Sequence, residues 1–113
     1  MYAQKTIIRV PMGRAGELRQ IIAQKYLPVV RSRPGFMAAY LLEQIDDADK
    51  CELVQFWDNQ AAIENFHRTG MLQASLQSIA AELPGVYVER QGYVIRVAVG
   101  TLPIDEAEGA ASV

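Results

Sequence analysis

The sequence predicts one α+β domain with elements in the order βαββαβ and two helices on one face of an antiparallel sheet. Short segments rich in apolar and β-branched residues alternate with longer segments of helical periodicity. Pro-Gly pairs at residues 34–35 and 84–85 end the two helical segments. The length of 113 residues suits a single domain. This combination is the ferredoxin-like arrangement.

The first half of the chain contains one expected strand and one expected helix. Residues 5–11 are expected to form the strand, because this segment is short and β-branched and Pro11 ends it. Apolar residues then recur at helical spacing as far as Pro34. Pro28 lies inside this helix and has no backbone N–H to donate. We therefore expect a kink or a break at residues 24–27.

The second half begins with two further strands, at residues 36–43 and 51–57. Aspartates crowd the segment between them, which predicts a hairpin with a rather long polar loop. Asp58 or Asn59 is expected to cap the second helix.

Two glycines are expected to interrupt the remaining elements. The second helix is expected to bend near Gly70 before Pro84 ends it. Residues 86–99 supply the last strand, which we expect to be broken or bulged at residues 91–92.

The strand pattern also predicts a partner. A sheet with one face in water alternates apolar and polar residues. Residues 36–42 do not alternate, and only Arg96 interrupts the apolar run of residues 93–99. Both faces of the sheet therefore look covered, and two helices can cover only one of them. We expect an obligate homodimer in which two sheets pack face to face.

Composition excludes several classes of protein. The formal net charge of −2 argues against nucleic-acid binding, which needs concentrated Lys and Arg. No apolar run approaches the roughly 20 residues of a spanning helix. Cys51 is the single cysteine and cannot form an internal disulfide, which favours a cytoplasmic protein. The expected domain covers residues 1–99, and residues 100–113 form an acidic tail that is either loose or packed on the partner subunit.

The sequence also contains no motif for a metal or a common cofactor. Cys51 has no Cys or His at ligand spacing, and the aspartates at residues 46–49 do not match a calcium loop. No phosphate-binding glycine loop or nucleophile elbow is present. We therefore expect a protein without metal or cofactor.

Three segments resemble the antibiotic biosynthesis monooxygenase family of the dimeric α/β-barrel superfamily. They are the Pro-Gly-Phe turn at residues 34–36, the strand at residues 51–57 that ends in Trp57, and the helix opening at residues 58–63. The resemblance covers residues 5–99. It implies a cofactor-independent monooxygenase that uses dioxygen on an electron-rich aromatic molecule, quinol-like or polyketide-like. The alternative is a non-catalytic small-molecule-binding dimer or an isomerase on the same scaffold.

The departures from that family are as informative as the matches. Apart from Trp57, the positions that the polyketide oxygenases fill with asparagine, tyrosine and arginine hold apolar or amide residues here: Leu53, Ile63 and Gln77. Leu76 stands where the haem-degrading branch carries its histidine ligand, which argues against that way of binding haem iron. Other members carry histidine at the position of Phe66, and here His67 follows one residue later.

Five residues are candidates for the site. His67 is either a general base or a histidine at the edge of the core. Gln55 faces a cavity, water or the dimer interface, and in a cavity it could donate to a developing oxyanion. Trp57 is either the wall of an aromatic site or a core residue that holds the second helix, and both can be true. Tyr26 and Tyr40 either orient the substrate or pack at the core margin.

Overall fold

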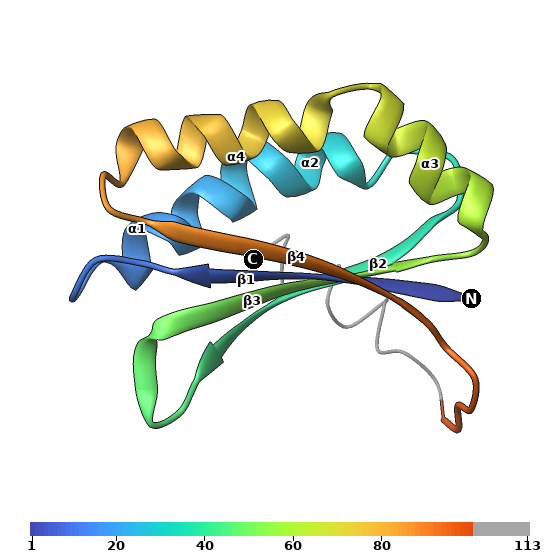
Figure 1. Cartoon of the computed structure of the whole chain (residues 1–113), viewed down its shortest axis with the longest axis horizontal. Coiled ribbons are helices and arrows are strands. Elements are labelled where there is room, and N and C mark those ends of the chain that lie inside the picture. Colours follow the sequence, from blue (N-terminus) through green and yellow to red (C-terminus); the bar gives the residue numbers. More distant parts are fainter. Residues whose placement is uncertain (101–113) are drawn as a thin grey trace.

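The computed structural model describes residues 1–100 as a four-stranded antiparallel sheet with its helices on one face (Figure 1). The sheet order is β2-β3-β1-β4, and the strands are β1 (Tyr2–Arg9), β2 (Phe36–Gln44), β3 (Asp47–Trp57) and β4 (Tyr87–Val94). The predicted α+β order is confirmed. Residues 101–113, which contain most of the predicted tail, lie outside the described residues.

The first helical stretch contains α1 (Ala15–Ile21), η1 (Ile22–Tyr26) and α2 (Leu27–Val30). The segment η1 is a π-helical turn, in which the Leu27 N–H bonds to the carbonyl of Ile22. It lies just before Pro28, whose ring cannot donate to the preceding turn. The predicted irregularity is therefore present as a widened turn.

The second helical stretch contains α3 (Gln60–Arg68) and α4 (Met71–Glu82). Asn59, rather than Asp58, caps α3, because its Oδ1 accepts from the Ala62 N–H at 2.9 Å. Gly70 separates the two helices with a φ of 72°, a backbone conformation that favours glycine. The predicted bend is confirmed.

Two predicted connections were wrong. The loop between β2 and β3 contains only residues 45–46, because β3 begins at Asp47, and a register irregularity near Glu43 accommodates the tight turn. Strand β4 passes residues 91–92 without a break and pairs with β1 in one unshifted register. It ends at Val94, so the remainder of the predicted strand, residues 95–99, is not strand.

The Pro-Gly-Phe turn fixes the start of α3 against the sheet. Gly35 has a φ of 78°, and a side chain built there would collide with the Cβ of Ala62 in α3. Its carbonyl accepts the Asp58 N–H at 2.8 Å. Glycine is required at this position by both conformation and close approach.

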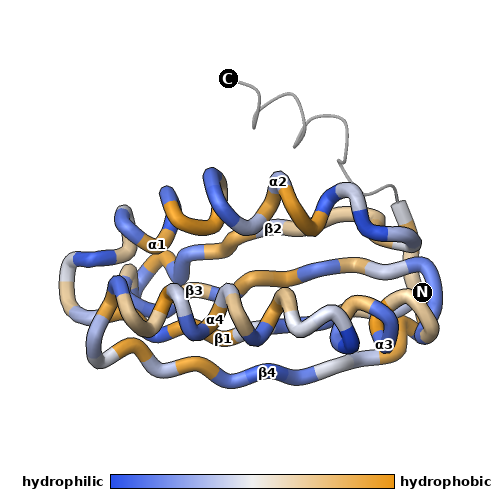
Figure 2. Tube along the Cα trace, turned by 90° about the horizontal axis from the view of Figure 1, so that it is seen from above, coloured by the Kyte–Doolittle hydropathy of each residue, from blue (hydrophilic) through white to orange (hydrophobic). Residues whose placement is uncertain are grey.

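The helices lie in two rows over the sheet. Seen from above, α1 and α2 form one row near β2, and α3 and α4 form the other (Figure 2). The core fills the space between these rows and the sheet, where Ile8, Leu18 and Ile79 are almost completely buried. We call this side of the sheet the helix face and the other side the open face.

Candidate functional site

Polar side chains are buried on the helix face of the two central strands. Gln4 and Thr6 come from β1 and Gln55 from β3, with exposed fractions of 4%, 0% and 0%. Gln4 and Gln55 are direct partners in the β1–β3 register, which places their Cα atoms about 5 Å apart. Trp57 follows on the same face of β3 and is also fully buried. We call these four residues the polar row.

Each residue of the polar row keeps one buried atom without a hydrogen-bond partner among the described residues. These atoms are Gln4 Oε1, Thr6 Oγ1, Gln55 Nε2 and Trp57 Nε1. Most buried polar atoms in proteins have a partner, because leaving one unpaired costs about 1–3 kcal/mol. Four such atoms side by side are expensive for stability alone and indicate a surface built to bind something.

Tyr26 closes one end of the polar row. Its hydroxyl donates to Gln55 Oε1 at 2.7 Å, and the tyrosine is 2% exposed. Burial raises the pKa of Tyr26 far above its usual value, and the hydrogen bond to Gln55 opposes this only in part. Tyr26 is therefore a neutral phenol that occupies the Gln55 carbonyl and leaves the Gln55 amide N–H groups free to donate.

His67, in the last turn of α3, lies at the other end. Its Nε2 is 2.8 Å from Gln4 Nε2, so the amide donates to a neutral ring that carries its proton on Nδ1. Burial lowers the pKa of His67 below its usual 6.5, and the positive charge of Arg90 lowers it further. The ring is thus a neutral acceptor near pH 7.

Trp57 is part of the aromatic core. The ring centroid of Phe66 lies 5.1 Å from it at an interplanar angle of 32°, and that of Phe36 lies 5.5 Å away, edge to face. These contacts pin α3 to the sheet, as expected of a core tryptophan. The unpartnered indole N–H still belongs to the polar row.

The structure separates Tyr40 from the other predicted site residues. A register shift between Phe36 and Ala38 inserts one extra residue in β2, which reverses the faces of the residues that follow. Tyr40 therefore pairs with Val54 and contacts the Phe56 ring at 6.2 Å on the open face. Within one chain, Tyr40 and Trp57 cannot hold the same substrate ring.

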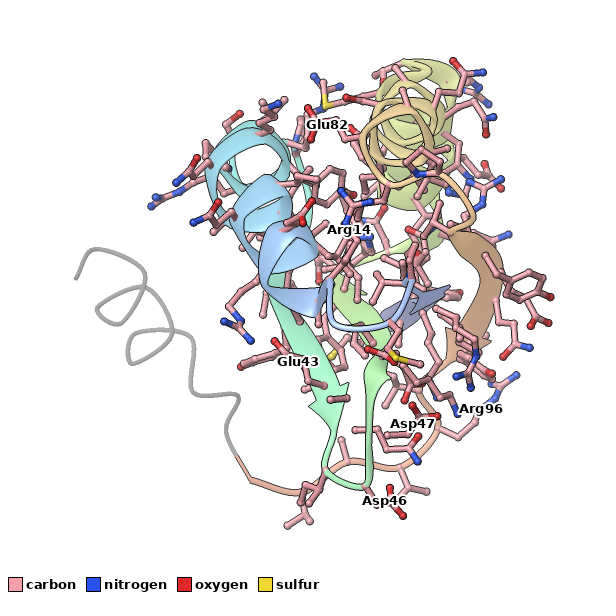
Figure 3. All side chains as sticks on the ribbon, turned by 90° about the vertical axis from the view of Figure 1, so that its left-hand side faces the viewer. Arg14, Glu43, Asp46, Asp47, Glu82 and Arg96 are labelled. Atoms are coloured by element: carbon pink, nitrogen blue, oxygen red, sulfur yellow. The ribbon has the colours of Figure 1, made fainter. Side chains whose placement is uncertain are left out.

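A small pocket opens between the two helical rows, above Tyr26. It has a volume of about 50 Å³, and its lining residues are Ile21, Lys25, Tyr26, Ser75, Ser78 and Ile79. We call it the helix slot. The Lys25 ammonium pairs with the Glu82 carboxylate at 2.7 Å. Arg14, which lies with Glu82 between the rows in Figure 3, donates to the Glu82 carbonyl at 3.3 Å.

Sequence reasoning missed Gln4 and Thr6. Both are polar residues that alternate with Lys5 in a short strand, and Ile8 two residues later shows which face is buried. The shared face of residues 4, 6 and 8 was the signal available in the sequence. Their closeness to Gln55 and His67 depends on strand register and on a contact between residues 63 positions apart.

Metal ligands and spanning helices were also sought in the described part of the chain. No group of three or more His, Cys, Asp and Glu side chains there could hold a metal ion. None of the helices within residues 1–100 is long and apolar enough to cross a membrane.

The fold is that of a small α+β domain, and the polar row is its candidate site between sheet and helices. The family model described as "Antibiotic biosynthesis monooxygenase" matches residues 1–77. The chain belongs to this family, as its sequence motifs indicated. No curated protein matches the chain.

Solved structures share the fold at low sequence identity. One from Deinococcus radiodurans, named as an antibiotic biosynthesis monooxygenase, has a TM-score of 0.74 at 16% identity and covers 90% of this chain and 99% of its own. The haem degrader MhuD from Mycobacterium tuberculosis, with two haems bound in its active site, has a TM-score of 0.69 at 20% identity (88% and 100% covered). SnoaB of Streptomyces nogalater, a cofactor-independent oxygenase in mutant form, has a TM-score of 0.67 at 19% identity (90% and 97% covered).

Proposed function

We propose that this protein is a cofactor-independent monooxygenase of an electron-rich aromatic molecule, with a quinol as the simplest substrate class. The observation that carries the proposal is the polar row, whose unpartnered donors lie beside a neutral histidine. Family membership and the likeness to a cofactor-independent oxygenase point in the same direction.

In the proposed reaction, the quinol supplies all the electrons. Loss of a hydroxyl proton makes the ring a strong enough donor to pass one electron to dioxygen. The two radicals then combine at a ring carbon to form a hydroperoxide, which loses water. One quinol and one dioxygen give one hydroxyquinone and one water, so one oxygen atom enters the product and no external reductant is needed.

The side chains divide this work between them. A substrate hydroxyl that reaches the polar row takes the place of the Gln4 amide on His67 Nε2, and His67 accepts its proton. The N–H groups of Gln55 and Trp57 have no other partner and donate to the oxyanion that forms. Tyr26 holds the Gln55 amide in the orientation that presents these donors.

The same proposal includes a homodimer that covers the open face. Tyr40 supports it, because its hydroxyl is buried without a partner among the described residues, although no helix of residues 1–100 covers that face. Tyr40 would then contact the second copy rather than the substrate. Light scattering at micromolar concentration should give twice the mass of the chain. A stable single-chain particle would contradict the dimer and leave the site within each chain unchanged.

Oxygen consumption tests the activity directly. The purified protein is incubated under air with menadiol, trimethylhydroquinone or anthrone, and uptake is compared with autoxidation in the absence of protein. We expect faster uptake for at least one substrate, and labelled dioxygen should place one labelled atom in the product and the other in water. Rates equal to autoxidation for all three would remove the oxygenase and favour the small-molecule binder or the isomerase.

A further inference from the structure

The helix slot is a second feature that the proposed chemistry does not use. Its lining comes from the end of α1 and from η1 in one helical row and from α4 in the other. Ligand sites in proteins are mostly apolar pockets with a few placed polar groups. Ile21 and Ile79 supply apolar walls from the two helical rows, and the ring of Tyr26 belongs to the lining.

Two serines of α4 also line the slot, Ser75 half-buried and Ser78 exposed. Ser75 and Ser78 lie three residues apart on α4, so they share one side of the helix. Neither hydroxyl makes a hydrogen bond within residues 1–100. A serine hydroxyl can both donate and accept, which suits a ligand hydroxyl better than a bare cation or a hydrocarbon.

The charge and the size of the slot limit the class of ligand that it can bind. Lys25 is the only cation in the lining, and Glu82 already neutralises it, so the slot offers no net attraction for an anion. A volume of about 50 Å³ is a third of that of a cavity of about 150 Å³ that encloses benzene. The slot can therefore take the edge of one ring, with the rest of the molecule outside.

We infer that the helix slot binds the edge of a neutral phenolic ring, stacked near Tyr26, with its hydroxyl on Ser75 and Ser78. This inference deepens the proposed function and rests on it for the identity of the ligand as substrate. It assigns a specificity role to the two serines. Tyr26 belongs to the lining of the slot and also donates to Gln55, so it connects the slot to the polar row.

Three matched probes test the slot by NMR of isoleucine methyl groups. Phenol is expected to shift the methyls of Ile21 and Ile79 saturably and to leave Ile45, which is fully exposed in the β2–β3 turn, unchanged. Anisole lacks the hydroxyl hydrogen and should bind several-fold more weakly. Shifts confined to other isoleucines, or equal affinity for both probes, would overturn the inference. Benzoate that binds more tightly than phenol would also overturn it, because Lys25 would then be the determinant.

Variants on α4 supply the second arm. Ser75→Leu fills the slot and should weaken phenol binding by about tenfold or more, whereas Gln77→Leu, on the exposed part of the same helix, should leave it unchanged. Ser78→Ala removes only a hydroxyl and cannot disturb the helix, so it keeps the test valid if Ser75→Leu misfolds. Ser78→Ala should weaken phenol but not anisole. Unchanged phenol affinity in both serine variants would refute the slot.

Failure of this inference can be told apart from failure of the proposed function. If phenol binds as expected and no quinol increases oxygen uptake, the inference about the slot is supported and the proposed oxygenase activity is refuted. If quinols drive uptake and Ser75→Leu leaves KM unchanged, the oxygenase stands and the slot is not part of it.

Discussion

Polar side chains on the two faces of the sheet differ in how fully they are paired. On the open face, polar residues pair with each other: Lys5 bonds Glu52 at 3.0 Å, and Gln91 bonds Glu89 at 3.3 Å. On the helix face, Thr6 and Gln55 are fully buried and keep an atom without a partner among the described residues. Pairing across a strand surface is what a structural role requires. The unpaired face is therefore the one where function is to be sought.

Tyr40 is the informative exception on the open face. Its hydroxyl is buried without a partner among residues 1–100, and its ring contacts Phe56. The charged residues of that face lie on β1, on the first half of β3 and on β4. The apolar part around Tyr40 is where a second copy is expected to pack in the proposed homodimer.

The largest expected effect comes from removing the base on the helix face. General acid–base catalysis contributes about 10²–10⁴-fold, so His67→Ala should reduce quinol-dependent oxygen uptake by that factor. Arg68→Ala is the matched control, because Arg68 is exposed on the same turn and donates to Asn65 of its own helix. Both rates are measured with the oxygen electrode. Unchanged uptake in His67→Ala would remove the base assignment and keep the fold.

Much of the fold could be predicted from the sequence, because its signals are local. Pro28 marks the widened turn and Gly70 the break between α3 and α4, since each has a backbone constraint that no neighbour alters. Ile45 and Asp46 were expected in a long loop because three aspartates look like loop residues. Their actual tight turn depends on pairing between β2 and β3 that extends past the aspartates.

The site was predicted less completely, because it depends on register. Gln55, Tyr26 and His67 were recognised as polar or titratable residues near apolar segments, and the structure places all three around the polar row. Tyr40 was grouped with Trp57 because both are aromatic residues of adjacent strands. One extra residue at the β2 bulge places Tyr40 on the other face, and no residue in the sequence indicates the bulge.

The second largest expected effect is on stability, and it tests whether the unpartnered polar atoms of the helix face destabilise the fold. Thr6→Val replaces a buried hydroxyl that lacks a partner by a methyl of similar shape, and should stabilise the fold by about 1 kcal/mol. Lys5→Ala, next to it on the open face, breaks an exposed ion pair and should cost less than about 1 kcal/mol. Urea unfolding of both variants gives the signs. Destabilisation by Thr6→Val would mean that its hydroxyl is paired in solution, and the contrast between the faces would disappear.

The smallest expected effect concerns the charge beside His67. Its pKa is lowered by burial first and by Arg90 second, so activity should fall only as the pH drops below 6.5, where the ring gains its proton. Between 6.5 and the native pKa, the unfolded chain binds more protons than the folded one. Stability from the neutral His67 is therefore complete above 6.5 and is lost as the pH falls through the native value.

Arg90→Gln removes only the second of these two causes. It should move the acid limb of kcat/KM to higher pH only in part, because burial continues to hold the pKa down. Arg68→Gln changes the charge by the same amount on the neighbouring residue and should leave the limb in place, since the shift of His67 is attributed to Arg90 rather than to Arg68. A limb that stays fixed in Arg90→Gln, or one that moves equally in both variants, would show that the helix face does not set the protonation of His67. The contrast between the two faces would then concern packing alone.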